Sequence, residues 1–182
     1  MTPGDFLDLG SREAIDLALH RMVKKGTLRR LARGLYDYPR RDPDLGLLSP
    51  TTDAIVKALK GRDNIQLQPT GSYAANLLGL SEQIPMKIVF LTDGPCRKLQ
   101  LGKQVIVLKH TTTRIMATAG RASGLVIQAL KHIGQQYIDD SIVTRLRNNL
   151  TADDKKQLLH DIRYAPAWIA AIMRRVIQNE EE

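Results

Sequence analysis

The feature that most constrains this chain is a predicted helix that leads directly into a short basic hairpin. Residues 11–26 begin with Ser11, a favourable N-cap, and end with Gly26, a favourable C-terminal cap. Apolar residues recur at helical spacing between these caps and predict one buried stripe, formed by Ala14, Ile15, Ala18, Leu19, Met22 and Val23. Residues 27–39 predict a hairpin that bends at Gly34. Leu28, Leu31 and Leu35 would anchor it, while Arg29, Arg30 and Arg33 point away.

A helix followed at once by an arginine-bearing hairpin is typical of a winged helix-turn-helix, in which the helix enters a DNA groove and the hairpin lies beside it. Thr2 and Pro3 begin a short preceding helix, with Phe6, Leu7 and Leu9 as its apolar side. A winged helix normally packs three helices, and the chain begins at what would be the second. We therefore expect an N-terminal winged helix-turn-helix whose first helix is short or absent.

The distribution of charge favours a polyanionic partner. The chain carries a formal net charge of +8, and residues 21–41 hold eight basic residues against Asp37 as the single acidic one. The predicted phosphate-contacting residues are His20, Lys24, Lys25, Arg29, Arg30, Arg33, Arg40 and Arg41. The predicted base-edge residues, at the start of the helix, are Ser11, Arg12, Glu13 and Asp16. Arg12 suits a guanine edge, because its guanidinium can bond O6 and N7 together. The alternative is a solvated charged face.

The rest of the chain predicts an α+β protein: a mixed α/β region with a small sheet, followed by a helical C-terminal tail. Residues 40–50 predict a linker, so we expect a DNA-binding domain over residues 1–41 and an α+β domain over residues 49–182. The predicted strands are residues 65–68, 87–92, 98–101 and 104–109, the last two joined around Gly102 and Lys103. The predicted helices are residues 50–60, 70–79 and nearly everything from Ala122 to a frayed acidic tail at residues 180–182.

No catalytic or metal-binding constellation is predicted. Thr70-Gly71-Ser72 lacks the fuller phosphate-binding loop pattern, and a nucleotidyltransferase would need paired acids where the next strand ends in Asp93 alone. The acidic pairs at residues 139–140 and 153–154 are explained as helix caps. The histidines are scattered, and Cys96 has no base at a recognisable spacing. We expect no enzymatic activity, no metal and no cofactor.

The single cysteine excludes an intrachain disulfide, and no apolar run approaches the roughly 20 residues that cross a bilayer. The N-terminus has no secretory pattern. We therefore expect a cytoplasmic protein without a membrane partner. Aromatic residues make up 4% of the chain, which disfavours a reader of single-stranded RNA. Contact with double-stranded RNA or tRNA stays open through Arg145, Arg147, Arg163, Arg174 and Arg175.

Three segments resemble the AbiEi-type antitoxins of type IV (abortive infection) toxin–antitoxin systems, which are also described as winged-helix regulators. They are PGDFLDLGSREAIDLALHRMVKKGTLRRLARGLYDYP, PTGSYAANLLGLSEQIP and VFLTDGP. The resemblance covers residues 2–110 well and the helical tail loosely.

The resemblance implies a winged-helix domain that binds the promoter of its own operon, and a C-terminal region with antitoxin activity against a nucleotidyltransferase-like toxin. A stable complex with the toxin is not implied, and no residues for the antitoxin role follow. The expected function is therefore a DNA-binding antitoxin and transcriptional autorepressor in phage defence. The alternative is a winged-helix module that binds protein or RNA without specific DNA binding.

Overall fold

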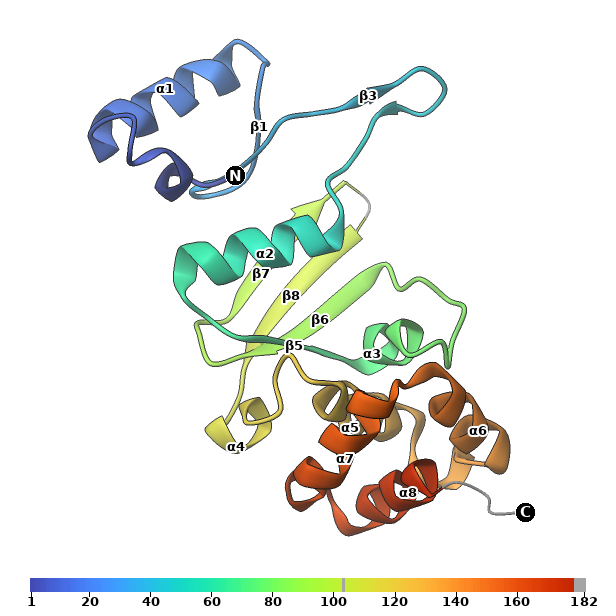
Figure 1. Ribbon diagram of the computed structural model, residues 1–182. Coiled ribbons are helices and arrows are strands. Elements are labelled where there is room, and N and C mark those ends of the chain that lie inside the picture. The colour runs from blue at the N-terminus through green and yellow to red at the C-terminus, as the bar shows by residue number, and fades with distance from the viewer. Residues whose placement is uncertain (103, 179–182) are drawn as a thin grey trace. The chain divides into compact units, whose positions relative to one another are not determined.

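The computed structural model describes residues 1–102 and 104–178, which form two compact units (Figure 1). The first unit comprises Met1–Ile65 together with Leu99–Val105, and the second comprises Gln66–Lys98 and the chain from Ile106 onward. Lys103 and the predicted acidic tail at residues 180–182 lie outside the described residues. The secondary structure confirms an α+β protein with a small sheet and a helical C-terminal part.

The first unit begins with a short 3-10 helix, η1 (Pro3–Phe6), and the helix α1 (Arg12–Lys24). Two hairpins follow, β1 (Arg29–Ala32) with β2 (Leu35–Asp37), and β3 (Arg41–Asp42) with β4 (Gly46–Leu47). Helix α2 (Thr52–Asp63) completes the order. The predicted helix and basic hairpin are confirmed, whereas residues 40–50, predicted as a linker, contain the second hairpin. Gly46, at a φ of 74°, supplies the left-handed turn that this hairpin requires.

The four-stranded sheet has the order β5-β6-β8-β7, with β5 (Leu67–Thr70), β6 (Lys87–Thr92), β7 (Arg97–Leu101) and β8 (Gln104–His110). Strands β7 and β8 contribute residues to both units. β5 pairs antiparallel with β6, in a register that sets Leu67 opposite Thr92. All four predicted strands are present, and β5 lies two residues later in the chain than predicted.

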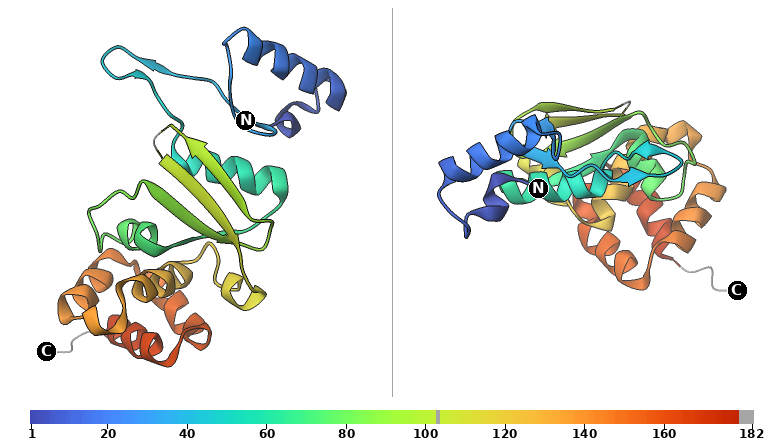
Figure 2. Two further views of the ribbon diagram at one scale, coloured as in Figure 1. Left: turned by 180° about the vertical axis from the view of Figure 1, so that it is seen from behind. Right: turned by 90° about the horizontal axis from the view of Figure 1, so that it is seen from above.

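The helices of the second unit are α3 (Gly71–Leu77), α4 (Thr113–Met116), α5 (Ala122–Ile133), α6 (Asp140–Asn149), α7 (Ala152–Asp161) and α8 (Ala167–Ile177). Two 3-10 turns, η2 (Gln135–Tyr137) and η3 (Ile162–Tyr164), connect the later ones. Helices α5–α8 gather into one bundle with α3 against it (Figures 1 and 2). Leu130, Leu146, Leu158 and Ile169, each fully buried, form the centre of its core. The helical C-terminal part is therefore confirmed, while α4 was not predicted.

Close packing in the second unit depends on Gly124 in α5. A Cβ atom at this position would lie 2.3 Å from the carbonyl oxygen of Thr118 and 2.5 Å from Oε1 of Gln68. Both distances are far below van der Waals contact. The backbone of α5 can therefore approach Thr118 and the Gln68 side chain of β5 this closely only because residue 124 has no side chain.

The start of α7 shows how local sequence sets a helix boundary. The Thr151 hydroxyl accepts from the amide of Asp154, and a carboxylate oxygen of Asp154 accepts from the amide of Thr151 at 3.0 Å.

We expect Thr151→Ala to lower the free energy of unfolding by about 1 kcal/mol, measured by urea denaturation. The matched control is Asp153→Ala in the same first turn, where the side chain is exposed and no cap is lost. Equal losses in the two variants would contradict this role.

One expectation about α1 is wrong. Ile15 and Leu19 are buried, as predicted, and Val23 is half-buried. Ala14, Ala18 and Met22, predicted in the same buried stripe, are exposed instead. The physical reason is that none of the described segments of this unit covers that side of the helix. Leu7 and Leu9, predicted as part of the apolar side of the preceding helix, are also exposed, because η1 ends at Phe6.

Candidate nucleic-acid interface

Helix α1 packs one face on the hairpin and leaves the opposite face in solvent. Ile15 and Leu19 contact Leu28 and Tyr36, and these four buried residues form a small core of their own. The outer face carries Glu13, Asp16, His20 and Lys24, all exposed, with Arg12 exposed at its N-terminal end and Lys25 following the last turn. Four of the predicted DNA-contacting residues, Glu13, Asp16, His20 and Lys24, are thus brought together along one accessible helix face, with Arg12 and Lys25 at its two ends.

Three of the predicted base-edge residues make contacts within this helix or at its N-cap. The hydroxyl of Ser11 accepts a hydrogen bond from the amide of Ala14 at 3.3 Å, as an N-cap does. Nε of Arg12 donates to a carboxylate oxygen of Asp16 at 3.1 Å. Both side chains of this pair are about half exposed, at 58% and 49%. A pair so exposed contributes little to stability, so Arg12 can leave Asp16 for another acceptor at small cost.

The β1–β2 hairpin presents some of its arginines and uses another internally. Gly34 has a φ of 66°, the left-handed conformation that a tight hairpin bend requires. Leu28 and Leu35 are buried, Leu31 is half-buried, and Arg30 and Arg33 are exposed, all as predicted for an anchored basic hairpin. The hairpin therefore presents two exposed guanidinium groups on its surface, and that of Arg30 also donates from Nε to the carbonyl of Ala32 at 3.4 Å.

Arg29 does not point away, which corrects the sequence-based expectation. It lies opposite Asp37 across the hairpin, and its Nη2 donates to the Asp37 carboxylate at 2.5 Å and to the carbonyl of Leu48 at 2.9 Å. The side chain is only 34% exposed. Opposite charges that face each other on neighbouring strands attract. The alternation of apolar and polar residues along the sequence does not show which residues face each other, so it did not predict this pair. Arg29 thus ties the hairpin to the segment that leads to α2.

A residue without a sequence signal fixes the tip of the hairpin. Nη1 of Arg62, in the last turn of α2, donates to the carbonyl of Arg33 at 2.8 Å, while the same guanidinium pairs with Asp63. The bond joins segments 29 residues apart, so no local pattern could have predicted it.

The second hairpin carries the last predicted phosphate contacts. Arg40 and Arg41 are exposed before and within β3. The carboxylate of Asp42 accepts from the amides of Asp44 and Leu45 at 2.9 Å each, which fixes the turn that follows. Arg40 and Arg41 thus lie on a short, ordered hairpin, and their predicted role is not contradicted by any contact described for them.

The candidate chemical groups elsewhere have structural contacts. The hydroxyl of Thr70, before α3, donates to Oε1 of Gln128 at 2.8 Å. Cys96 is exposed, and its sulfur accepts from the amide of His110 at 3.3 Å. Over residues 1–102 and 104–178 no three His, Cys, Asp or Glu side chains are grouped as metal ligands. In the same part of the chain, no helix has the length and apolar character to span a membrane.

Comparison with known proteins gives one match. Residues 1–158 match the sequence family described as "Family of unknown function (DUF6088)". No curated protein matches the chain, and no solved structure does.

Proposed function

The chain belongs to the DUF6088 family, and we propose that this member binds double-stranded DNA through a winged-helix-like unit formed by α1 and the β1–β2 hairpin. The observation that supports this most is the exposed set of basic side chains on the outer face of α1 and on the hairpin that follows it. Lys24, Arg30 and Arg33 are all exposed, without carboxylate partners among their described contacts. Cations placed in this way can replace the counterions of a DNA backbone.

The proposed division of roles follows from position along the helix. Arg12 lies at the N-terminal end of α1, the part that reaches base edges in helix-turn-helix proteins. Lys24 and Lys25 at the other end, and the arginines of the hairpin, would contact phosphates. Among these arginines Arg29 contributes least to phosphate binding, because the Asp37 carboxylate and the carbonyl of Leu48 already bind its guanidinium.

The test is a fluorescence-anisotropy titration of the full chain with the duplex that lies directly upstream of its own gene, and with a scrambled duplex of equal composition. Repeating the titrations at two salt concentrations separates sequence-specific binding from purely electrostatic binding. Tighter binding to the upstream duplex, weaker at higher salt, is the expected result. Equal affinity for both duplexes would overturn sequence-specific binding, and binding that is insensitive to salt would point to the alternative, a protein- or RNA-binding module.

Arg12→Ala should reduce discrimination between sequences more than it reduces total binding. A bidentate contact to one guanine contributes about 1–3 kcal/mol of discrimination, so the preference for the upstream duplex should fall by roughly 5- to 150-fold. Anisotropy titrations with both duplexes measure the ratio. Arg21→Ala is the matched control, because it removes the same charge from an exposed position of α1 that is not a predicted base contact, and it should leave the ratio unchanged. A uniform loss on both duplexes in Arg12→Ala would contradict base contact by Arg12.

The resemblance of residues 2–110 to AbiEi-type antitoxins supports a wider proposal: the protein represses its own operon and counteracts a nucleotidyltransferase-like toxin. Co-expression of the chain with a nucleotidyltransferase-like toxin from the same genome tests this. Restored growth is the expected result, and it should persist in a variant that no longer binds DNA. Absence of rescue by a chain that is expressed and folded would overturn the antitoxin role while leaving DNA binding standing.

A further inference from the structure

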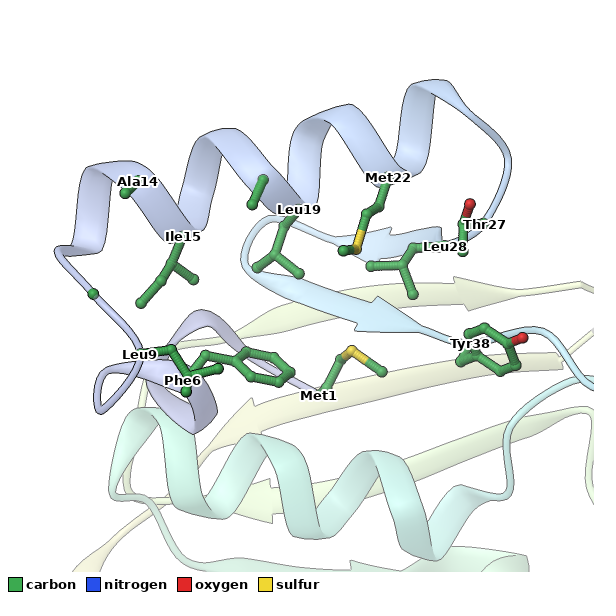
Figure 3. Close-up of a pocket in the computed structure, with 12 residues that line it drawn as sticks. Met1, Phe6, Leu9, Ala14, Ile15, Leu19, Met22, Thr27, Leu28 and Tyr38 are labelled. Atoms are coloured by element: carbon green, nitrogen blue, oxygen red, sulfur yellow. The ribbon is translucent and has the colours of Figure 1, made fainter.

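The exposed apolar side of α1 borders a pocket of about 510 Å³ within the first unit, which we call the α1 groove. Ala14, Ala18 and Met22 line it from α1, and Met1, Phe6 and Leu9 line it from the opposite side. Figure 3 shows Ile15, Leu19 and Met22 of α1 pointing across the groove toward Phe6 and Met1, with Leu28 and Tyr38 toward its other end. The groove therefore exists because the apolar side of α1 is only partly covered by the hairpin.

The chemistry of the α1 groove suits an apolar surface rather than a polar small molecule. Among the described residues that line it, Thr27 and Tyr38 alone have polar side chains, and Tyr38 is 61% exposed. Sites for small molecules normally add a few precisely placed polar or charged groups to an apolar lining. Leu9 at 76% and Met22 at 45% exposure are instead open to solvent, as contact residues of a protein interface are before binding.

The dimensions of the groove fit a helix. Its wall on α1 extends from Ala14 to Met22, eight residues or about 12 Å, which is roughly two helical turns. Ala14 and Ala18 are four residues apart and have the smallest side chains of this wall, so a second helix could approach α1 closely there. A helix that binds in this way presents apolar residues at positions i, i+3, i+4 and i+7.

The charges beside the groove indicate the chemistry of that helix. Arg21 is three residues from Ala18, and Lys25 is three residues from Met22, so both lie along the edge of the groove on α1. Both are exposed. A helix bound beside them gains from acidic residues on the side of its apolar stripe that meets α1 and loses from basic ones there, whereas Asp5 and Asp8 are exposed beside Phe6 and Leu9 on the opposite wall.

We propose that the α1 groove binds an amphipathic helix of a protein partner whose apolar stripe has acidic residues on the side that meets α1. The groove lies on the side of α1 opposite Glu13, His20 and Lys24, so the partner helix and DNA would use different faces and share only Lys25, which follows the last turn of α1. The inference thus goes beyond DNA binding and does not depend on it.

The test uses two fluorescent peptides of about 18 residues, roughly 27 Å long when helical, with the same leucine stripe. One peptide has Glu residues along one side of the stripe, and the other has Lys residues at the same positions. Each peptide is titrated with the full chain in the absence of DNA. We expect the Glu peptide to bind at least tenfold more tightly than the Lys peptide. Arg21→Glu should reduce or reverse that preference.

A matched pair of variants locates the site. Ala18→Glu introduces a charge into the groove and should weaken binding of the Glu peptide at least tenfold. Leu17→Glu makes the same charge change on a neighbouring exposed residue that does not line the groove, and should change affinity less than twofold. Circular dichroism and thermal unfolding of both variants confirm that α1 is retained.

Three results would overturn the proposal. The first is that neither peptide binds, and the second is that the two bind equally well. The third is self-association of the chain, seen by sedimentation and abolished by Ala18→Glu, because a second copy would then occupy the groove.

Discussion

Replacing Lys24, Arg30 and Arg33 together by alanine is expected to weaken binding of the upstream duplex about 100-fold at physiological salt. Each cation that displaces condensed counterions contributes on the order of 1 kcal/mol at that ionic strength, and three such contacts are lost. The slope of log K against log salt should fall in magnitude by about 3. Anisotropy titrations over a series of salt concentrations measure both quantities.

The matched control for this triple variant removes the same charge from the second unit. Lys131, Arg145 and Arg174 are exposed on α5, α6 and α8, and their replacement by alanine leaves α1 and the hairpin intact. We expect its affinity to change less than threefold. If the two triple variants lose affinity equally, the protein binds DNA through its overall charge, and the interface proposed on the first unit is wrong.

Asp161→Ala should lower the free energy of unfolding by about 3 kcal/mol, the lower end of the range for removing one member of a buried ion pair. Asp161 is fully buried at the end of α7 and binds the start of α5. Nη1 of Arg121 donates to its carboxylate at 2.9 Å, and the hydroxyl of Ser123 donates at 2.5 Å. Nδ1 of His160 lies 2.9 Å from the same carboxylate. Urea denaturation measures the loss.

The partners of Asp161 explain why the lower end of that range applies. Arg121 and His160 are 42% and 66% exposed, so water can replace the carboxylate for them. Ser123 is fully buried and would have no acceptor in its place. Ser123→Ala should therefore recover part of the stability in the double variant. If Asp161→Ala costs less than the exposed control Asp153→Ala, the buried carboxylate does not hold α5 and α7 together.

The same carboxylate predicts how stability depends on pH. Burial favours the neutral acid, but hydrogen bonds from Ser123, His160 and Arg121 outweigh it and hold the pKa of Asp161 below its ordinary value near 3.8. A carboxyl with a lowered folded-state pKa stabilises the protein above its unfolded-state pKa, and this contribution is lost as pH falls through the folded-state value. The stability difference between the natural chain and Asp161→Ala should thus be constant above about pH 5 and shrink below about pH 4. A difference that stays unchanged down to pH 2 would contradict the assignment.

The periodic parts of the chain could be predicted, because their signals are local. The caps and apolar spacing of α1 lie within residues 11–26, and β6 has the bounds that its run of apolar residues predicted. The helices from Ala122 onward also have their caps and apolar spacing within single short segments, with Asp139 and Thr151 as N-caps of α6 and α7. Local patterns suffice here since the buried face and the capping residue belong to one short segment.

The parts that could not be predicted depend on contacts between distant segments. The pairing of Arg29 with Asp37 needs the strand register, and the bond from Arg62 to Arg33 needs the position of α2. Apolar spacing also cannot tell whether a stripe is covered, so Ala14, Ala18 and Met22 were predicted to be buried. The same error concealed the α1 groove, because an apolar helix face that remains open looks identical in sequence to one that is packed.

The bond between Arg62 and the carbonyl of Arg33 has a consequence for the energetics of recognition. A hairpin tip that becomes ordered only on contact with its ligand loses conformational entropy at that moment, about 0.5–1.5 kcal/mol for each long side chain that is immobilised. Here the main chain at the tip is already fixed when the unit folds, so that part of the entropy loss precedes any encounter. In the proposed complex with DNA the backbone at Gly34 is thus preorganised, so ordering of the main chain at the tip does not add to the translational, rotational and side-chain entropy lost on binding.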